Sequence, residues 1–141
     1  MRYHVVAVGR LRDAALRAAC EAYLRRARRY ARVAVVEVRA EAQLARAIPA
    51  GARLIALSRG GEAWSSIDLA RRTADWDMAG RDVALAIGGA DGLAEAILDD
   101  AERVWSLSAM TLPHELARVV VLEQLYRAFT IRKGEPYHRG G

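Results

Sequence analysis

The sequence predicts a single α/β domain, built on a mostly parallel sheet with helices on both faces. Three observations indicate this class: strand-like and helix-like stretches alternate along the chain, the strand-like stretches are apolar almost throughout, and there is no internal repeat. Nearly continuous apolar strands are typical of sheets that are covered on both faces. The length of 141 residues is that of one domain, so we expect residues 1–141 to fold as one unit.

Hydrophobic periodicity predicts the individual elements. Apolar runs indicate strands at residues 3–9, 33–38, 53–57, 82–89 and 103–110. Stretches with a 3.6-residue period indicate helices at residues 11–31, 41–48, 65–78, 93–101 and 113–132. We expect a turn in SRGGE after the third strand, an N-cap at Ser65 or Ser66, and Pro113 in the first turn of the last helix.

Composition favours a reducing compartment and a polyanionic partner. Cys20 is the single cysteine, so it cannot form an internal disulfide, and we expect it to be an inert packing residue. No run of about 18 uncharged apolar residues indicates a membrane span, and MRYHVVAVGR resembles a strand more than a signal peptide. We therefore expect a cytoplasmic protein. The net charge of +5 favours nucleic acid, although a GC-rich genome would produce the same arginine-rich composition.

The last predicted helix is apolar on nearly every side. Val119, Val120, Val121 and Leu122 follow one another, whereas a helix that packs on one sheet face normally keeps a polar side. Either this helix lies deep in its own core or it packs against a second copy of the chain, and we favour a homodimer. Glu123 and Arg127 have the favourable i,i+4 order and form either a structural or a functional pair.

Two segments at strand ends are candidate ligand sites. AIGGADG, residues 86–92, places glycines where a strand meets a helix, which is typical of a binding turn or of a plain tight turn. WSLSAMTLPH, residues 105–114, offers hydroxyl groups that either bind a ligand or cap the strand end. Neither segment has a dinucleotide or phosphate-loop fingerprint. The histidines are far apart and have no metal-binding spacing, so we expect no metal.

The chain ends in GEPYHRGG, residues 134–141. A turn formed by Gly134 and Pro136 precedes Tyr137, His138 and Arg139, which carry an aromatic ring, an imidazole and a guanidinium. Side chains of this kind have no packing reason to lie where a chain frays. We therefore expect this segment to take part in function.

Two stretches of the C-terminal half closely resemble one known family. They are IGGADG and WSLSAMTLPHELARVVVLEQLYRAFTIRKGEPYHR. They resemble the RlmH family, bacterial SPOUT-class methyltransferases that methylate N3 of a pseudouridine in large-subunit ribosomal RNA. The N-terminal half is similar only through VAVGR and AYLRR, and it is shorter than usual between residues 39 and 53. Gly140 and Gly141 extend beyond the usual family terminus.

The resemblance implies a fold, a cofactor and a set of site residues. The implied fold ends in a trefoil knot, whose loops bind S-adenosylmethionine, and the implied enzyme is a homodimer. Free RNA, a ribosomal subunit and the whole ribosome stay open as its substrate, and we favour the assembled 70S ribosome. By position, the implied cofactor-binding residues are Leu57, Gly88, Gly89, Leu107, Ser108, Ala109, Met110, Thr111 and Leu112. Asp91 receives no role.

The resemblance also implies that the C-terminal segment reaches the active site at the dimer interface. Tyr137 would stack on a base, Arg139 would pair with phosphate, and His138 would either hydrogen-bond the target base or assist removal of its N3 proton. The expected RNA-binding residues are Arg25, Arg28, Arg29 and Arg127, with Arg32 on the same face of the first helix. The alternative is that this face of the first helix is exposed to solvent and binds no RNA.

Two other classes of function remain open at this stage. A ribosome-binding module that kept the fold but lost catalysis would have no cofactor affinity and would tolerate loss of His138. An unrelated α/β nucleotide-binding enzyme would need a phosphate loop, which the sequence lacks.

Overall fold

The strands form one parallel sheet in the order β2-β1-β4-β3-β5 in the computed structural model, which describes residues 1–140. Their bounds are Tyr3–Val8 (β1), Val33–Val38 (β2), Arg53–Ala63 (β3), Val83–Ile87 (β4) and Arg103–Ser106 (β5). Gly141 lies outside the described residues. Tyr3 pairs in register with Val33 on one side and Val83 on the other. The predicted parallel sheet is therefore confirmed.

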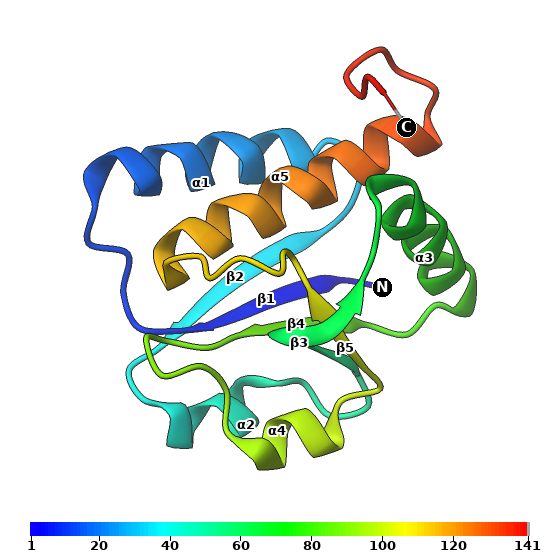
Figure 1. The fold of residues 1–141 in the computed structure, drawn as a ribbon. Coiled ribbons are helices and arrows are strands. Elements are labelled where there is room, and N and C mark those ends of the chain that lie inside the picture. The colour runs from blue at the N-terminus through cyan, green and yellow to red at the C-terminus, as the bar shows by residue number, and fades with distance from the viewer. Residues whose placement is uncertain (141) are drawn as a thin grey trace.

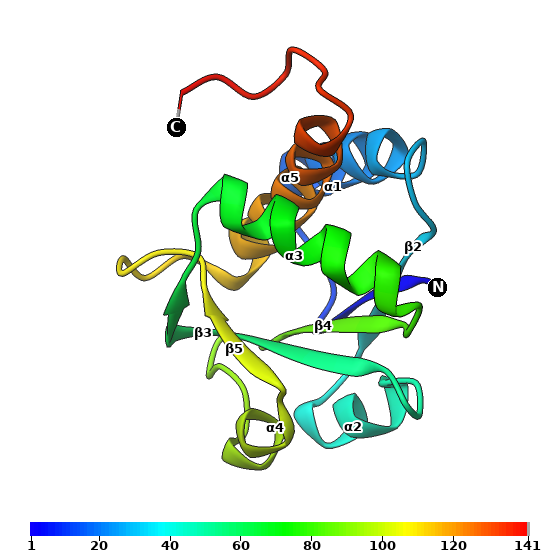
Figure 2. The same cartoon turned by 90° about the vertical axis from the view of Figure 1, so that its right-hand side faces the viewer.

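Helices cover both faces of this sheet, as predicted. Their bounds are Ala14–Ala27 (α1), Leu44–Ala47 (α2), Ser66–Ala79 (α3), Glu95–Asp100 (α4) and His114–Arg132 (α5), with a 3₁₀ turn at Glu41–Gln43 (η1). Figures 1 and 2 show α1, α3 and α5 on one face and α2 and α4 on the other. The last helix thus shares its layer with the first, and the C-terminal tail (residues 134–140) extends beyond it.

The core is split by the sheet into two parts. Val5 and Leu85 face the larger part, together with Leu125 and Phe129 of α5. The smaller part lies under α2 and α4 and includes Leu44, which is fully buried. Cys20 is buried in the larger part, where the sequence placed it. Two-sided burial explains why the strands are apolar at successive positions and not at alternate ones.

The third strand is longer than the sequence predicts. The predicted turn in SRGGE is wrong, because β3 continues through it to Ala63. β3 pairs with β5 in two registers, which change between Leu57 and Glu62, so the extra residues form an irregularity within the strand. A Cβ atom on Gly61 would lie 2.5 Å from the carbonyl oxygen of Val104, and this close approach explains the glycine.

Helix boundaries differ from the predicted ones where a cap decides them. α1 begins at Ala14 and not at residue 11, because the Asp13 carboxylate accepts a hydrogen bond from the Leu16 N–H at 3.0 Å. Ser65 caps α3 as expected, accepting from the Asp68 N–H at 3.0 Å. Pro113 occupies the N-cap position of α5, one residue before the expected place.

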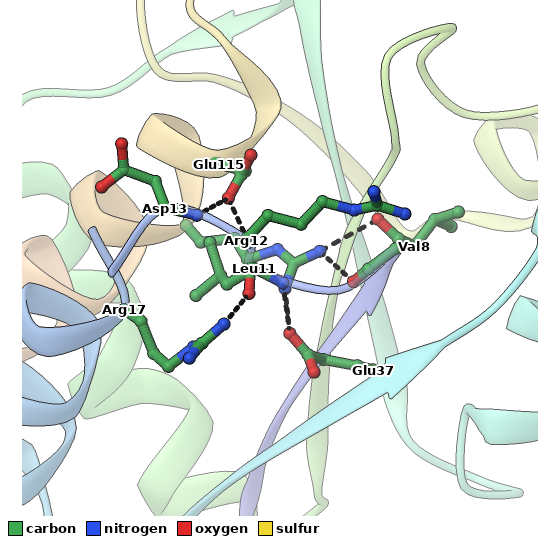
Figure 3. Close-up of polar contacts among 9 residues, drawn as sticks. Val8, Leu11, Arg12, Asp13, Arg17, Glu37 and Glu115 are labelled. Atoms are coloured by element: carbon green, nitrogen blue, oxygen red, sulfur yellow. Dashed lines mark hydrogen bonds and ion pairs between the residues drawn. The ribbon is translucent and has the colours of Figure 1, made fainter. Parts of the chain in front are cut away.

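A buried arginine joins α5 to the ends of β1 and β2. Arg118 is only 2% exposed, and its guanidinium lies 2.6 Å from the Glu37 carboxylate. It also donates to the carbonyl oxygen of Val8 at 3.0 Å and to that of Gly9. The same Glu37 oxygen accepts from the Leu11 N–H at 3.0 Å (Figure 3). The turn after β1 is therefore fixed against α5.

Glu115 adds a second connection at the start of α5. Its carboxylate accepts hydrogen bonds from the backbone N–H groups of Arg12 and Asp13, at 2.7 and 3.2 Å (Figure 3). These hydrogen bonds lower the pKa of the Glu115 carboxyl, and the one from the Arg12 N–H has the largest effect. The first turns of α5 and the β1–α1 turn thus form one rigid unit beside the carboxyl ends of the strands.

Candidate functional site

A cavity of about 320 Å³ lies at the carboxyl ends of β4 and β5, beside the middle of β3 where its register changes. This is the edge of an open parallel sheet where ligands normally bind. The start of α5 closes one side of the cavity. Its lining residues are Leu57, Ser58, Arg59, Ile87, Gly88, Gly89, Gly92, Leu93, Trp105, Leu107, Ser108, Met110, Thr111, Leu112, His114 and Ala117.

The structure brings together nearly all residues that were expected to bind a cofactor. Leu57, Gly88 and Gly89 line the cavity. The lining also includes every expected residue of the β5–α5 loop except Ala109, namely Leu107, Ser108, Met110, Thr111 and Leu112. Strand ends that are distant in sequence therefore converge on one site.

The loop after β4 has a shape that only glycine allows at Gly88. A Cβ atom there would lie 2.4 Å from the carbonyl carbon of Gly92, closer than real Cβ contacts come. The Gly92 N–H donates to the Gly89 carbonyl at 3.0 Å, and Gly92 has a φ of +77°. The loop therefore closes on itself, and its backbone lies open to the cavity.

The β5–α5 loop is held by its own hydroxyl groups. The sequence predicts that the fifth strand runs to residue 110. In the structure β5 ends at Ser106, because the chain turns there. The Ser106 hydroxyl donates to the Ser108 carbonyl at 3.1 Å, and the Ser108 hydroxyl accepts from the Met110 N–H at 2.9 Å. The sequence left two uses open for these hydroxyl groups, ligand binding and capping of the strand end. In the structure the hydroxyls of Ser106 and Ser108 cap the turn. The Thr111 hydroxyl accepts from Arg59 of β3 at 2.5 Å.

Sequence reasoning missed two polar residues of this cavity, Ser58 and Arg59, and for His114 it left a structural role and a place in a ligand pocket open. The signal was present, because Ser58 and Arg59 directly follow the predicted third strand and His114 follows Pro113. Within residues 1–140 the lining contains no Asp or Glu, so Arg59 gives the mouth of the cavity a positive charge. Backbone groups and apolar side chains make up most of the remaining wall.

A second group of candidate residues lies in the C-terminal tail. Gly134 has a φ of +68°, and the next N–H, that of Glu135, donates to the Thr130 carbonyl at 3.0 Å, which ends α5. The Tyr30 hydroxyl donates to the Glu135 carboxylate at 2.6 Å. This hydrogen bond raises the pKa of Tyr30 to about 12. The tail is therefore tied to the end of α1 as well as to α5.

The tail then folds back onto α5. The Tyr137 hydroxyl donates to the Glu123 carboxylate at 2.6 Å, and its ring meets the Tyr126 ring edge-on at 4.6 Å. Arg127 lies over the Tyr137 ring at 4.6 Å and contacts Nδ1 of His138 at 3.1 Å. Burial and the hydrogen bond to Glu123 raise the pKa of Tyr137, so this hydroxyl stays protonated as the donor.

The cavity and the tail are separate within one chain. Tyr137, His138 and Arg139 are absent from the cavity lining described above. Ala117 lines the cavity, whereas the tail packs on α5 near Arg127, about 15 Å further along the helix axis. The cavity and the tail are therefore two distinct groups of candidate residues.

The expected RNA-binding arginines fall into two groups. Arg25 and Arg28 line a shallow groove on α1 with Glu21 and Leu24, and Arg29 is exposed nearby. Arg28 also donates to the Val33 carbonyl at 2.9 Å, so it has a structural partner. Arg127 is engaged inside the chain by Glu123, Tyr137 and His138. RNA contact by these four residues stays a prediction.

Residues 1–140 contain neither a metal-binding cluster nor a membrane-spanning helix. No group of three His, Cys, Asp or Glu side chains has a geometry that would hold a metal ion. No helix is long and apolar enough to cross a membrane.

Comparison with known sequences identifies the family. A family model described as a predicted SPOUT methyltransferase matches residues 1–138. The ribosomal RNA large subunit methyltransferase H of Anaeromyxobacter sp. is 48% identical, over 99% of this chain and 100% of the relative. The protein of the same name from Gloeobacter violaceus is 42% identical, over 99% and 100%.

Solved structures confirm the fold. A probable methylase family protein from Haemophilus influenzae aligns with a TM-score of 0.64 at 12% identity, covering 98% of this chain and 70% of that one. A putative methyltransferase from Legionella pneumophila with bound SAM gives a TM-score of 0.52 at 14% identity, covering 89% and 65%. The chain is thus an α/β methyltransferase of the SPOUT class. Within that class it belongs to the family of the ribosomal RNA large subunit methyltransferase H proteins.

Proposed function

We propose that the protein is an S-adenosylmethionine-dependent methyltransferase that modifies N3 of a pseudouridine in large-subunit ribosomal RNA, on the assembled 70S ribosome. The observation that carries this proposal is the glycine-walled cavity at the strand ends, in a chain that is 48% identical along its length to a protein named ribosomal RNA large subunit methyltransferase H. The resemblance supplies the pseudouridine N3 specificity.

The cavity fits this cofactor by shape and by the chemistry of its wall. Leu57, Leu107 and Leu112 offer apolar surface, while the loop of Gly88 and Gly89 exposes backbone groups. A side chain at Gly88 would meet the backbone of the same loop, so the shape of this wall depends on glycine. A mixed wall of this kind suits a nucleoside joined to an amino acid.

The cofactor supplies an electrophilic methyl group on a sulfonium. The chain has to present the target nitrogen to that group and to exclude competing water. The Tyr137 ring supports a base by stacking, and Arg139, which is exposed, pairs with a backbone phosphate. Overall, N3 loses its proton to water and gains the methyl group.

Two copies of the chain are needed for this arrangement. The tail does not line the cavity of its own chain, so it serves the cavity of a two-fold related partner. Val120 of α5 is half-buried in one chain, which supports α5 as part of the contact between copies. The trefoil knot that the resemblance implies belongs to the same proposal.

The proposed substrate also accounts for the charge of the chain. Arg25, Arg28 and Arg29 provide phosphate contacts that position a ribosome without reading sequence. The net charge of +5 is sufficient for a large, folded RNA partner. Action on ribosomes places the protein in the cytoplasm.

Methyl transfer tests the proposal directly. The full chain and a variant truncated after Gly134 are incubated with labelled S-adenosylmethionine and ribosomes from a strain that lacks this gene. We expect label in the large-subunit RNA with the full chain alone. A folded full chain that labels no ribosomal particle would contradict catalysis and favour a binding module without activity.

A further inference from the structure

The contact between Arg127 and His138 determines which nitrogen of the imidazole carries the proton. A guanidinium nitrogen of Arg127 lies 3.1 Å from Nδ1 of His138. A guanidinium has donors only, so Nδ1 must accept this hydrogen bond with its lone pair. A neutral imidazole that accepts at Nδ1 carries its hydrogen on Nε2.

Arg127 is well fixed for this task. The Glu123 carboxylate accepts from two of its nitrogens, at 3.0 and 2.8 Å, and the Tyr137 ring lies 4.6 Å from the guanidinium carbon. The Glu123 side chain is only 15% exposed, so solvent screens the pair weakly. The hydrogen bond to Glu123 raises the pKa of Arg127, which therefore stays a donor at every working pH.

We propose that Arg127 holds His138 as the Nε2–H tautomer, so that His138 meets the target base as a hydrogen-bond donor to a carbonyl oxygen and not as the general base at N3. This inference rests on the proposed function and decides between the two roles that the sequence left open for His138. Arg127 is then a positioning residue, and Glu123 and Tyr137 position Arg127.

The chemistry of the base gives such a donor a purpose. N3 lies between two carbonyl groups, and the negative charge of the deprotonated ring spreads onto their oxygens. A hydrogen bond to one of these oxygens strengthens as that charge develops, so it lowers the barrier. The N3–H bond breaks with its proton going to water, the N3 lone pair bonds the methyl carbon, and the electrons of the broken S–C bond stay on sulfur.

The tautomer can be measured without any substrate. The chain contains 3 histidines, so ¹⁵N–¹H long-range correlation spectra of the full-length protein resolve each ring, and His138→Gln assigns the signal. We expect Nε2 to be protonated and Nδ1 to be bare in the wild type, with the preference lost in Arg127→Met. A wild-type spectrum that shows hydrogen on Nδ1 overturns the inference.

Kinetics on ribosomes test the role of the donor. A glutamine at position 138 can accept from Arg127 with its carbonyl and donate with its amide, but it cannot take a proton. We expect kcat/KM to fall about 100-fold in His138→Ala and less than about 10-fold in His138→Gln. The matched control is His4→Gln, because His4 lies near the amino end of β1. We expect its kcat/KM to equal that of the wild type.

The two experiments separate failure of the inference from failure of the proposed function. If His138→Gln is as slow as His138→Ala while both remain folded, His138 acts as the base and the inference is wrong. If the wild type transfers no methyl group to ribosomes, the proposed function is wrong, and the donor role falls with it whatever the spectra show.

Discussion

Gly88 shows how one residue can determine whether the cavity exists. Gly88→Ala places a methyl group 2.4 Å from the Gly92 backbone, so the loop must move. We expect the affinity for S-adenosylhomocysteine to fall about 5- to 150-fold, because an overpacked backbone shift costs about 1–3 kcal/mol. Isothermal titration calorimetry measures the change. Gly60→Ala is the matched control, since nothing lies within 4 Å of the added atom, and equal loss in both variants would contradict this role.

Asp82 provides a test of acid sensitivity at a single residue. The hydrogen bond with His4 at 3.0 Å, and then the one from the Arg2 N–H, lower the pKa of the Asp82 carboxyl. A lowered folded pKa stabilises the protein above the unfolded value of about 3.9, and this contribution is lost as pH falls through the folded value.

Asp82→Asn should therefore reduce the loss of stability on acidification. Urea midpoints between pH 6 and pH 3 measure it, and the variant curve should be flatter below about pH 4. An unchanged acid slope would show that Asp82 is not the group responsible. Asp75→Asn, whose side chain lies on α3 away from this pair, is the control.

For single residues, the sequence indicated candidate site positions best where a predicted strand end is followed by glycines or hydroxyl residues. For Gly88, Gly89 and Thr111 the residue pattern left ligand binding and a purely structural role open, and the family resemblance assigned them to the cofactor. All three line the cavity. Arg118 could not be predicted, since an arginine on a helix normally reaches solvent, and only the fold brings Glu37 and two carbonyl groups within its reach.

Among the elements, α5 has the most demanding position, because it touches the sheet ends, the cavity and the tail. Arg118→Met should lower the free energy of unfolding by about 1–3 kcal/mol, since it leaves the Val8 and Gly9 carbonyls without this donor and removes one of the two partners of Glu37. Urea unfolding measures the loss. Arg71→Met, on the exposed side of α3, should change stability by less than about 0.5 kcal/mol.

A double-mutant cycle separates the ion pair from the loss of volume. Glu37→Gln combined with Arg118→Met should be less destabilising than the sum of the two single changes, by about 0.5–3 kcal/mol, because the charges lie 2.6 Å apart. Strict additivity would mean that Arg118 acts through packing and its hydrogen bonds to the Val8 and Gly9 carbonyls, without help from the ion pair.

Element types were predictable from periodicity, but several boundaries and the strand order were not. SRGGE has the composition of a turn, yet pairing with β5 keeps it in β3, which is a tertiary effect. The order β2-β1-β4-β3-β5 depends on crossovers between distant segments, about which apolar runs carry no information. Likewise, GEPYHR indicated function, while the bond from Arg127 to His138 required the folded tail.

For the whole molecule, the separation of tail and cavity in one chain leads to a test of the proposed dimer. Gly88→Ala weakens cofactor binding in the cavity of its own subunit, and His138→Ala removes the imidazole from the tail that serves the partner. A heterodimer of the two variants keeps one complete site, made from the cavity of one subunit and the tail of the other. At low cofactor concentration we expect it to transfer methyl groups at about half the wild-type rate, whereas each variant alone should be at least about 5-fold slower than wild type.

Co-expression with two different affinity tags, followed by purification on both, yields this heterodimer free of homodimers. A tail that served its own cavity would leave both sites of the heterodimer defective, so the rate would stay at the level of the single variants. Failure to recover any doubly tagged protein would contradict the dimer itself. Recovery of activity would show that the arginine and tyrosine contacts of the tail orient His138 toward a neighbouring chain, which explains why the tail is fixed on α5 and not near its own cavity.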